Sequence, residues 1–209
     1  GSIDQNINER QLDDLNEFDV AASLDLGRFF PEKAGVRLPL YYGYSKSVSN
    51  PKYDPLNPDI ELSKSLGHAE SKAEKDSIKH ISQDVITRKS INFTNVKVEP
   101  QKQKEKAHLW DLQNFSVTYS YNETTKRDID TENNLYKTHR GMFSYNYSNR
   151  PTIIQPLNKV KFLQKGPLKL IGNFNFYPLP TQVSFRTDLY RRYHEIQTRN
   201  ITNPNYIIP

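Results

Sequence analysis

The sequence predicts a mainly β protein, an antiparallel meander of long hairpins with one short helix inside a long loop. Three observations support this fold class. Apolar and polar residues alternate with a period of two along several segments, which is typical of strands with one apolar face. Aromatic residues make up 11% of the chain, although hydrophobic residues as a whole make up only 35%. Apolar residues recur at helical spacing between about residues 68 and 86.

A hairpin is predicted near the start of the chain. Residues 18–26 (FDVAASLDL) place apolar side chains at every second position, and residues 36–45 (VRLPLYYGYS) repeat the pattern. The short FFPEKAG connection between them predicts antiparallel pairing. Because Pro39 has no backbone N–H to donate, we predict that the second strand is an edge strand or a bulged one.

Five further segments alternate in the same way and bring the predicted strands to seven. They are residues 91–96, 115–122, 142–148, 173–176 and 183–189. The first loses its alternation near Asn95, which predicts a bulge. The last continues toward Tyr193 and Ile196. Residues 203–209 show no such pattern, so no final strand is predicted there.

The longest connection, about residues 49–88, is predicted to contain the helix. Its apolar stripe consists of Ile78, Ile81 and Val85, which is too narrow for a deeply buried helix. We therefore predict a solvated helix on the side of this loop. Long loops of outer-membrane barrels tend to be extracellular, so the loop is expected outside the cell.

Composition excludes several protein classes. No stretch approaches 18 consecutive apolar residues, so no transmembrane helix is predicted. The absence of Cys excludes a disulfide scaffold, a thiolate zinc site and a cysteine nucleophile. The 29 Lys and Arg against 24 Asp and Glu give a net charge of +5, which is weak evidence for nucleic-acid binding.

The two faces of the predicted strands differ in a way that favours a membrane barrel. Several apolar faces are strings of aromatic residues: Tyr42 and Tyr44; Phe115, Tyr119 and Tyr121; Phe143, Tyr145 and Tyr147. Tyr suits a place where one end of the side chain is apolar and the other is wet. The opposite faces are rich in Ser, Thr and Asn, which suits a water-filled lumen. Because a closed bacterial barrel needs at least eight strands, residues 1–209 are predicted to be a single segment of a larger barrel, without an independent second domain.

Four stretches carry a resemblance to a known family. They are NEFDVAASLDLGRFFPEKAGVRLPLYYGYSKSVSNPKYDPLNPDIEL, TRKSINFTNVKV, KTHRGMFSYNYSNRP and SFRTDLYRRYHEIQTRNI. They resemble the SprA/Sov family, which forms the outer-membrane translocon of the type IX secretion system in Bacteroidetes and is also required for gliding motility. The resemblance runs from about Gln5 to Thr202.

The resemblance implies a location and a set of partners. It implies a very large single-chain β-barrel in the cell outer membrane, exposed at the cell surface, whose lumen conducts folded cargo proteins. It also implies a smaller outer-membrane barrel of the PorV type, a periplasmic plug protein and the lipid bilayer as partners, and no nucleic acid. Family members are several times longer, so this chain is expected to hold a minority of the strands and to adjoin the remainder of the parent barrel.

No catalytic, cofactor-binding or metal-ligating residues are predicted, and the chain is not expected to be an enzyme or to need a cofactor. The five His lie far apart in the sequence: His68, His80, His108, His139 and His194. The Asp128-x-Asp130-x-Glu132 segment is similar to part of a calcium loop, but Asn133 and His139 stand where an EF-hand needs Gly and Glu. We predict a polar hairpin loop there.

A soluble binding module is the alternative interpretation. Tyr190, Arg191, Arg192 and Tyr193 could form a basic and aromatic patch for nucleic acid or carbohydrate. Strand alternation places Arg191 and Tyr193 on one face and Tyr190 and Arg192 on the other. The four residues are therefore not predicted to form one platform, although the soluble β-rich module stays open as an alternative function.

Overall fold

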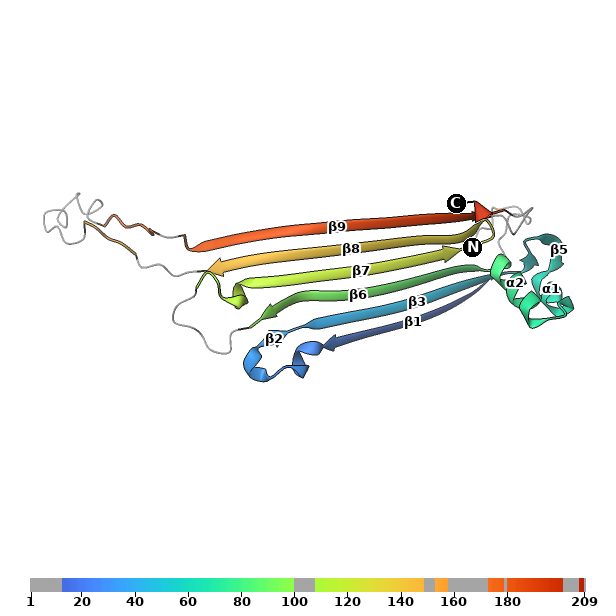
Figure 1. Cartoon of the computed structure of the whole chain (residues 1–209), viewed down its shortest axis with the longest axis horizontal. Helices are drawn as coiled ribbons and strands as arrows, with labels where there is room; N and C mark the ends of the chain where they lie inside the picture. The colour runs from blue at the N-terminus through green and yellow to red at the C-terminus, as the bar shows by residue number, and fades with distance from the viewer. Residues whose placement is uncertain are drawn as a thin grey trace, which may run out of the picture.

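The computed structural model describes residues 13–99, 108–148, 153–157, 173–178, 180–200 and 207–208. Its main feature is one antiparallel sheet of long strands laid side by side (Figure 1). The long strands follow in the order β1 (Asp13–Asp25), β3 (Pro39–Pro51), β6 (Asp84–Val98), β7 (Phe115–Arg127), β8 (Thr131–Ser148) and β9 (Gln182–Arg199). Two short strands complete it, β2 (Val36–Arg37) on β6 and β10 (Ile207–Ile208) on β9. The predicted meander of long hairpins is confirmed.

Short elements occupy the two ends of the sheet (Figure 1). One end carries the β4 (Tyr53–Asp54) and β5 (Asn57–Glu61) hairpin with helices α1 (Leu62–His68) and α2 (Lys72–Ser82). The other end carries three 3-10 turns, η2 (Leu26–Phe29), η3 (Glu32–Ala34) and η4 (Leu112–Asn114). Because the strands are antiparallel, every second connection returns to the same end.

The prediction of one helix between about residues 68 and 86 is wrong in number and extent. The described residues contain two helices, and α1 lies mostly before the predicted segment. Ser71 begins α2 because its hydroxyl accepts a hydrogen bond from the Glu74 N–H at 3.1 Å. Val85, predicted in the helical stripe, instead belongs to β6 and pairs with Val48. Pairing with a neighbouring strand thus overrides the local helical spacing.

The first predicted hairpin is confirmed, but its second strand is not an edge. Strands β1 and β3 pair antiparallel, with Val20 opposite Tyr44, while β3 pairs with β6 on its other side. Pro39 is accommodated because it is the first residue of β3, after an interruption at Leu38. A missing N–H costs no ladder bond between β3 and β6 there, since that ladder begins at Leu40.

The predicted bulge near Asn95 is confirmed. The register between β6 and β7 shifts between Phe93 and Val96. Asn95 adopts a positive φ of 53°, and its backbone N–H donates to the Thr118 hydroxyl at 3.0 Å. Asn tolerates this left-handed conformation better than most residues with a side chain.

Substitutions at Asn95 should separate backbone strain from other effects. Asn95→Val is expected to lower the free energy of unfolding by about 1–3 kcal/mol, because a β-branched residue fits the left-handed region poorly. Asn95→Gly is expected to be neutral within about 0.5 kcal/mol. Urea denaturation of the two variants measures the difference, and equal stabilities would show that the positive φ carries no strain.

The later strands agree with the predictions except in one place. Strand β9 runs through Tyr193 and Ile196, as predicted. The strand predicted over residues 173–176 is wrong, since this segment contains only an isolated bridge between Ile154 and Phe176. The chain end was predicted to form no strand, yet Ile207 and Ile208 pair with the end of β9.

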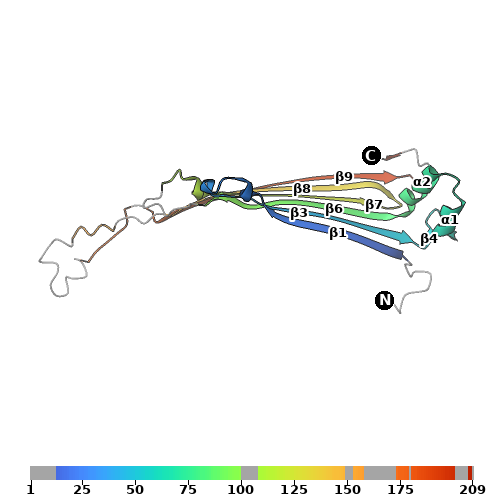
Figure 2. The same ribbon diagram turned by 90° about the horizontal axis from the view of Figure 1, so that it is seen from below.

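The sheet is a single layer with almost no core. In the edge-on view of Figure 2 its long strands run without a covering layer, and the helices lie beyond one end. Among the described residues, the buried hydrophobic side chains are Leu62, Ala69 and Tyr147. No closed barrel is seen in the described residues, where β1 forms an open edge. Since an apolar sheet face must be buried against something, this sheet needs a further layer, a membrane or a larger assembly.

None of the helices in the described parts of the chain is long and apolar enough to cross a membrane.

Candidate functional surface

The two faces of the sheet differ in chemical character. The register between neighbouring strands places apolar side chains mainly beside apolar side chains and polar side chains mainly beside polar side chains. We call one of the two faces the apolar face. Its side chains are Phe18, Val20, Ala22 and Leu24; Leu40, Tyr42 and Tyr44; Ile91 and Phe93; Phe115, Val117, Tyr119 and Tyr121; Phe143 and Tyr145; Val183, Phe185 and Leu189. The polar face is opposite. Its side chains include Asp19, Ser23, Ser45, Ser90, Asn92, Ser116, Thr118, Ser120, Asn122, Ser144, Asn146, Ser184, Arg186 and Asp188.

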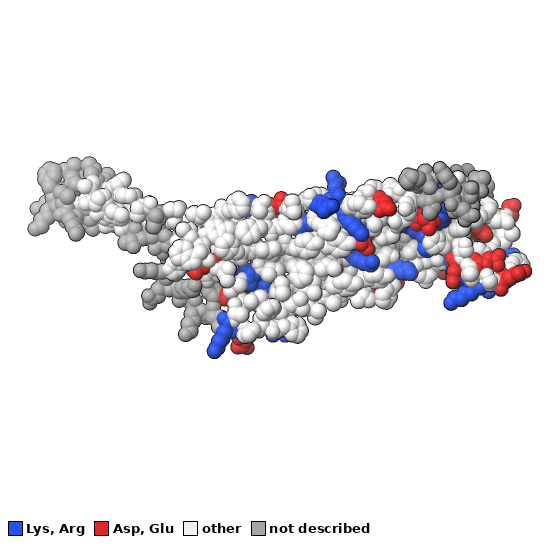
Figure 3. All heavy atoms as spheres, viewed as in Figure 1, with Lys and Arg blue, Asp and Glu red and all other residues white. Residues whose placement is uncertain are grey.

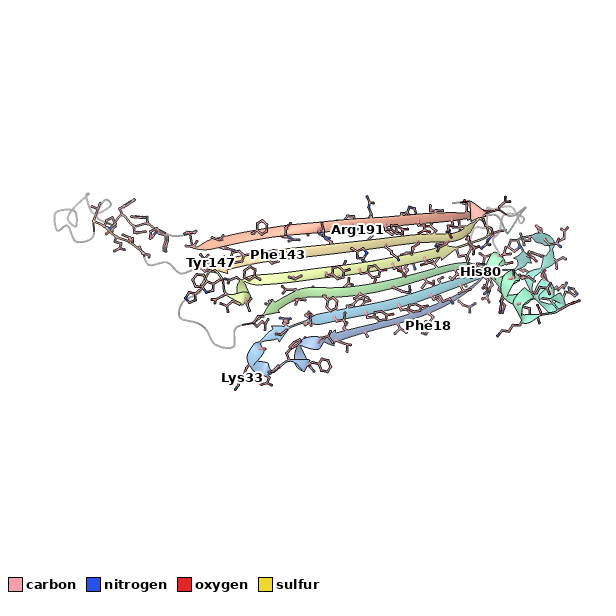
Figure 4. All side chains as sticks on the ribbon, in the orientation of Figure 1. Phe18, Lys33, His80, Phe143, Tyr147 and Arg191 are labelled. Carbon is pink, nitrogen blue, oxygen red and sulfur yellow. The ribbon has the colours of Figure 1, made fainter. Side chains whose placement is uncertain are left out.

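Side-chain contacts confirm the apolar face. The rings of Phe18 and Tyr44 lie edge to face with centroids 6.4 Å apart. Phe115 lies 5.8 Å from Phe143 and 5.0 Å from Tyr145, measured between ring centroids. Phe18 and Phe143 are labelled in Figure 4. These contacts are cross-strand pairs, so the aromatic strings predicted on separate strands form one continuous surface.

The polar face holds local hydrogen bonds and ion pairs. The Ser90 hydroxyl donates to Asn122 Oδ1 at 2.8 Å, and Asp188 lies 3.4 Å from Arg140 and 3.2 Å from Arg186. The predicted division of the Tyr190 to Tyr193 segment is also confirmed. Tyr190 and Arg192 pair with polar-face positions of β8, and the Arg192 guanidinium lies 5.7 Å from the centre of the Tyr190 ring.

A charged row crosses the apolar face and limits its apolar part. Glu123 lies 3.0 Å from Lys89 and 3.6 Å from Lys137, and it accepts the Tyr121 hydroxyl at 2.5 Å. Phe115 and Tyr121 are six residue steps apart, or about 20 Å at the usual rise of a strand. Sequence reasoning missed this row because the strands were predicted to end at Asn122 and to resume at Met142, whereas β7 and β8 continue through it.

Aromatic side chains border this apolar band at both ends. Tyr42, Tyr44 and Tyr121 lie beside the charged row. At the other end Phe29 and Trp110 are 86% and 74% exposed. The turn that presents Trp110 is held by Asn114, whose side-chain amide donates to the His108 and Leu109 carbonyls at 2.8 and 3.2 Å. The hydrogen bonds of Asn114 thus fix the turn on which the exposed Trp110 side chain lies.

A buried arginine ties α2 to the strand ends. Arg199, with a side chain only 6% exposed, donates to Glu132 through Nε at 2.9 Å and Nη2 at 2.5 Å. Its Nη1 reaches the Ile81 carbonyl on α2 at 3.3 Å and the Ile129 carbonyl at 3.4 Å. One side chain therefore joins β9, the β7–β8 hairpin and the helix. Sequence reasoning missed this contact, because Ile81 and Arg199 lie 118 residues apart.

The pKa of His80, on the same end of the sheet (Figure 4), is lowered from its ordinary value of 6.5. Burial is the largest cause, and Arg127 and Arg199 add to it. The Glu132 carboxylate, 3.6 Å away, raises the pKa but is outweighed. A lowered pKa favours neutral His80 in the folded protein, so protonation opposes the packing of α2 on the strand ends.

The packing of α2 is therefore expected to weaken on acidification. Above pH 6.5 His80 is largely neutral in both the packed and released helix. Below that value the released form takes up a proton more readily, so packing is lost progressively down to the lowered pKa. Hydrogen exchange of α2 amides between pH 7 and 5, corrected for intrinsic rates, measures the change. His80→Gln should abolish the pH dependence, and His68→Gln should keep it; an unchanged profile in His80→Gln would contradict the assignment.

The acidic residues of the predicted hairpin loop are engaged by neighbouring groups of the protein. Asp128 Oδ1 accepts the Asp130 and Thr131 N–H groups at 3.2 and 2.8 Å, so the polar hairpin loop predicted there is confirmed. Asp128 also pairs with Lys126 at 2.8 Å, and Glu132 with Arg199. Within the described ranges, no three His, Asp or Glu side chains are grouped so that they could hold a metal ion.

The comparison with protein families bears on the first third of the chain. Residues 1–66 match the SprA_N family model, described as motility related/secretion protein. The resemblance predicted from the sequence is thereby confirmed over these residues. The described part of this SprA_N region contains β1 to β5 and the beginning of α1. The family description names motility and secretion and no enzymatic activity. A search of curated proteins gives no match.

Proposed function

We propose that this chain forms part of the wall of the outer-membrane, protein-conducting translocon of the type IX secretion system, which serves protein export and gliding motility. The observation that carries the proposal is the apolar band of the sheet. The band is about 20 Å high, as given by the six residue steps from Phe115 to Tyr121. It lies on one face only and is bordered by aromatic residues at both ends. Transmembrane barrels have an apolar outer band about 25 Å high between two aromatic girdles.

The polar face is suited to line a water-filled passage. It is rich in hydroxyl and amide groups, of which Ser90 and Asn122 are hydrogen-bonded to each other, and Asp188 forms ion pairs with Arg140 and Arg186. This face is mainly polar, although Leu15, Tyr41 and Tyr190 also lie exposed on it. Export through such a lumen is passive, and no residue of the wall needs to react with the cargo.

The proposed partners are those that the resemblance to the SprA/Sov family implies. On β1, the edge remote from β3 has no strand partner among the described residues, and the remainder of the parent barrel would supply one. A PorV-type outer-membrane barrel, a periplasmic plug protein and secreted cargo complete the proposed machine. Long loops of outer-membrane barrels tend to be extracellular, but the connections between β3 and β6 (residues 52–83) and between β8 and β9 (residues 149–181) are of similar length and lie at opposite ends, so loop length does not determine which end is extracellular.

Cysteine labelling tests the wall. The chain has no Cys, so single cysteines can be placed on adjacent residues of β7 that point to opposite faces. Ser116→Cys is expected to react with a membrane-impermeant maleimide in outer-membrane preparations of the parent protein. Val117→Cys is expected to be protected by lipid, although Val117 is 45% exposed in this chain by itself.

Detergent provides the control for the labelling. Solubilisation is expected to expose Val117→Cys at least in part while leaving the labelling of Ser116→Cys unchanged. Equal labelling of the two cysteines in membranes would overturn the proposal. Together with recovery of the protein as a soluble monomer, that result would support the soluble nucleic-acid or carbohydrate module instead.

A further inference from the structure

An unpartnered cation lies on the apolar face at the border of the apolar band. Arg191 is exposed, lies near the middle of β9 (Figure 4) and is paired with His139 across the strands. Within the described part of the chain it makes no hydrogen bond or ion pair. Lys137 lies two residues from His139 on the same face of β8, so it is a diagonal neighbour of Arg191, within reach of two long side chains.

Charges of both signs lie near this place on the same face: Lys89, Lys137 and Arg191, with Glu123 and Glu195. Figure 3 shows Lys and Arg side chains across the middle of the sheet on the viewed face. Glu123, the carboxylate of the charged row, is shared by Lys89 and Lys137 and by the Tyr121 hydroxyl. Arg191 therefore offers its full charge to an external anion, and Lys137, which is 3.6 Å from Glu123, can contribute to the same site.

A short furrow lies one row further into the apolar band than these cations, and it is bounded along β8 by His139 and Phe143 on the same face. Gly141 lies between Tyr119 on β7 and Leu189 on β9, one row further into the band than His139 and Arg191. A Cβ atom built on Gly141 would meet nothing within 4 Å, so the space above this glycine is open. Its two walls are an aromatic ring and a leucine side chain that is 74% exposed.

We propose that this site binds an anionic lipid, with the headgroup phosphate between Arg191 and Lys137 and one acyl chain along the furrow above Gly141. The proposal rests on the proposed function, because it needs the apolar face to meet lipid. Charge complementarity and position identify the occupant: the cations stand at the border of the apolar band, where headgroups lie, and the short furrow at Gly141 lies on the apolar side of them. A soluble anion would use the cations but would leave the apolar furrow empty.

Native mass spectrometry of the parent protein in nonionic detergent tests the site. Phosphatidylglycerol and phosphatidylcholine with identical acyl chains are the probes. The wild type is expected to retain phosphatidylglycerol more tightly. Arg191→Gln is expected to weaken that binding about fivefold, the effect of one charge near a membrane surface. Gly141→Leu fills the furrow and is expected to weaken the binding of both lipids.

Arg192→Gln is the matched control, because Arg192 is the neighbouring residue and lies on the polar face. It is expected to leave phosphatidylglycerol binding unchanged. Equal losses of phosphatidylglycerol binding in the two glutamine variants, or equal retention of the two lipids by the wild type, would overturn the lipid site. If Val117→Cys is still protected in membranes, these results leave the proposed wall intact. Loss of that protection would instead overturn the proposed wall and the lipid site together.

Discussion

Replacing Gly141 with arginine is expected to prevent assembly of the parent protein in the outer membrane, whereas Met142→Arg is expected to assemble normally. The two residues are adjacent at the same depth of β8 but lie on opposite faces. An arginine at position 141 would stand inside the apolar band, one row from its charged border, where it would carry part of the about 2–4 kcal/mol that a charge costs at the midplane of a transmembrane barrel. An arginine at position 142 would instead lie opposite Asp188. The membrane-inserted fraction of each variant, resistant to urea extraction, measures the effect.

Gly141→Leu separates charge from size in this experiment. Because the space above Gly141 is open, the leucine side chain meets no steric obstacle, and it adds apolar area where lipid is expected. Assembly of Gly141→Leu should therefore match the wild type, even though the variant fills the furrow of the lipid site. Normal assembly of Gly141→Arg would contradict the assignment of the apolar face to lipid.

Removing the Arg199 side chain is expected to release α2 from the sheet. Breaking a buried, hydrogen-bonded ion pair on one side typically costs about 3–5 kcal/mol. The free-energy cost of Arg199→Met should lie near the lower limit of this range. The Glu132 side chain is 31% exposed, so water can hydrate its carboxylate once the arginine is gone. The Ile81 and Ile129 carbonyls also lose their donor. Hydrogen exchange and limited proteolysis within α2 measure the release.

Arg191→Met provides the comparison for Arg199→Met. Both replace an arginine of β9 with an apolar side chain of similar length, but Arg191 is exposed and has no partner in the described residues. Its loss is expected to change the protection of α2 by less than about 0.5 kcal/mol. Equal protection of α2 in both variants would contradict the role given to Arg199.

Alternation in the sequence was sufficient to predict most of the sheet. The β1–β3 hairpin, the bulge at Asn95 and the extension of β9 depend on local patterns that the structure preserves. Strand lengths were predicted less well. In β7 and β8 the alternation of aromatic and polar residues ends before the strands do, and the continuation is stabilised by pairing rather than by local sequence. A four-residue alternation at 173–176 was too short to form a strand without a long partner.

The surface features also differ in how far they could be predicted from the sequence. The two chemical faces could be predicted, because each follows from the parity of single strands. The charged row could not, since Lys89, Glu123 and Lys137 come together only through the registers of β6, β7 and β8. The Arg199 contacts depend on the placement of α2 against the strand ends, which no local pattern indicates.

The order of the long strands has a consequence for how the sheet is made. Each long strand pairs with the next long strand along the chain, so no strand has to enter between two that are already joined. The contacts in the sheet are therefore local in sequence for its size, which favours rapid formation of each hairpin. The sheet can grow one hairpin at a time as the chain is delivered. Each new strand then covers the open edge of the one before it, so the exposed edges are that of β1 and that of the newest strand.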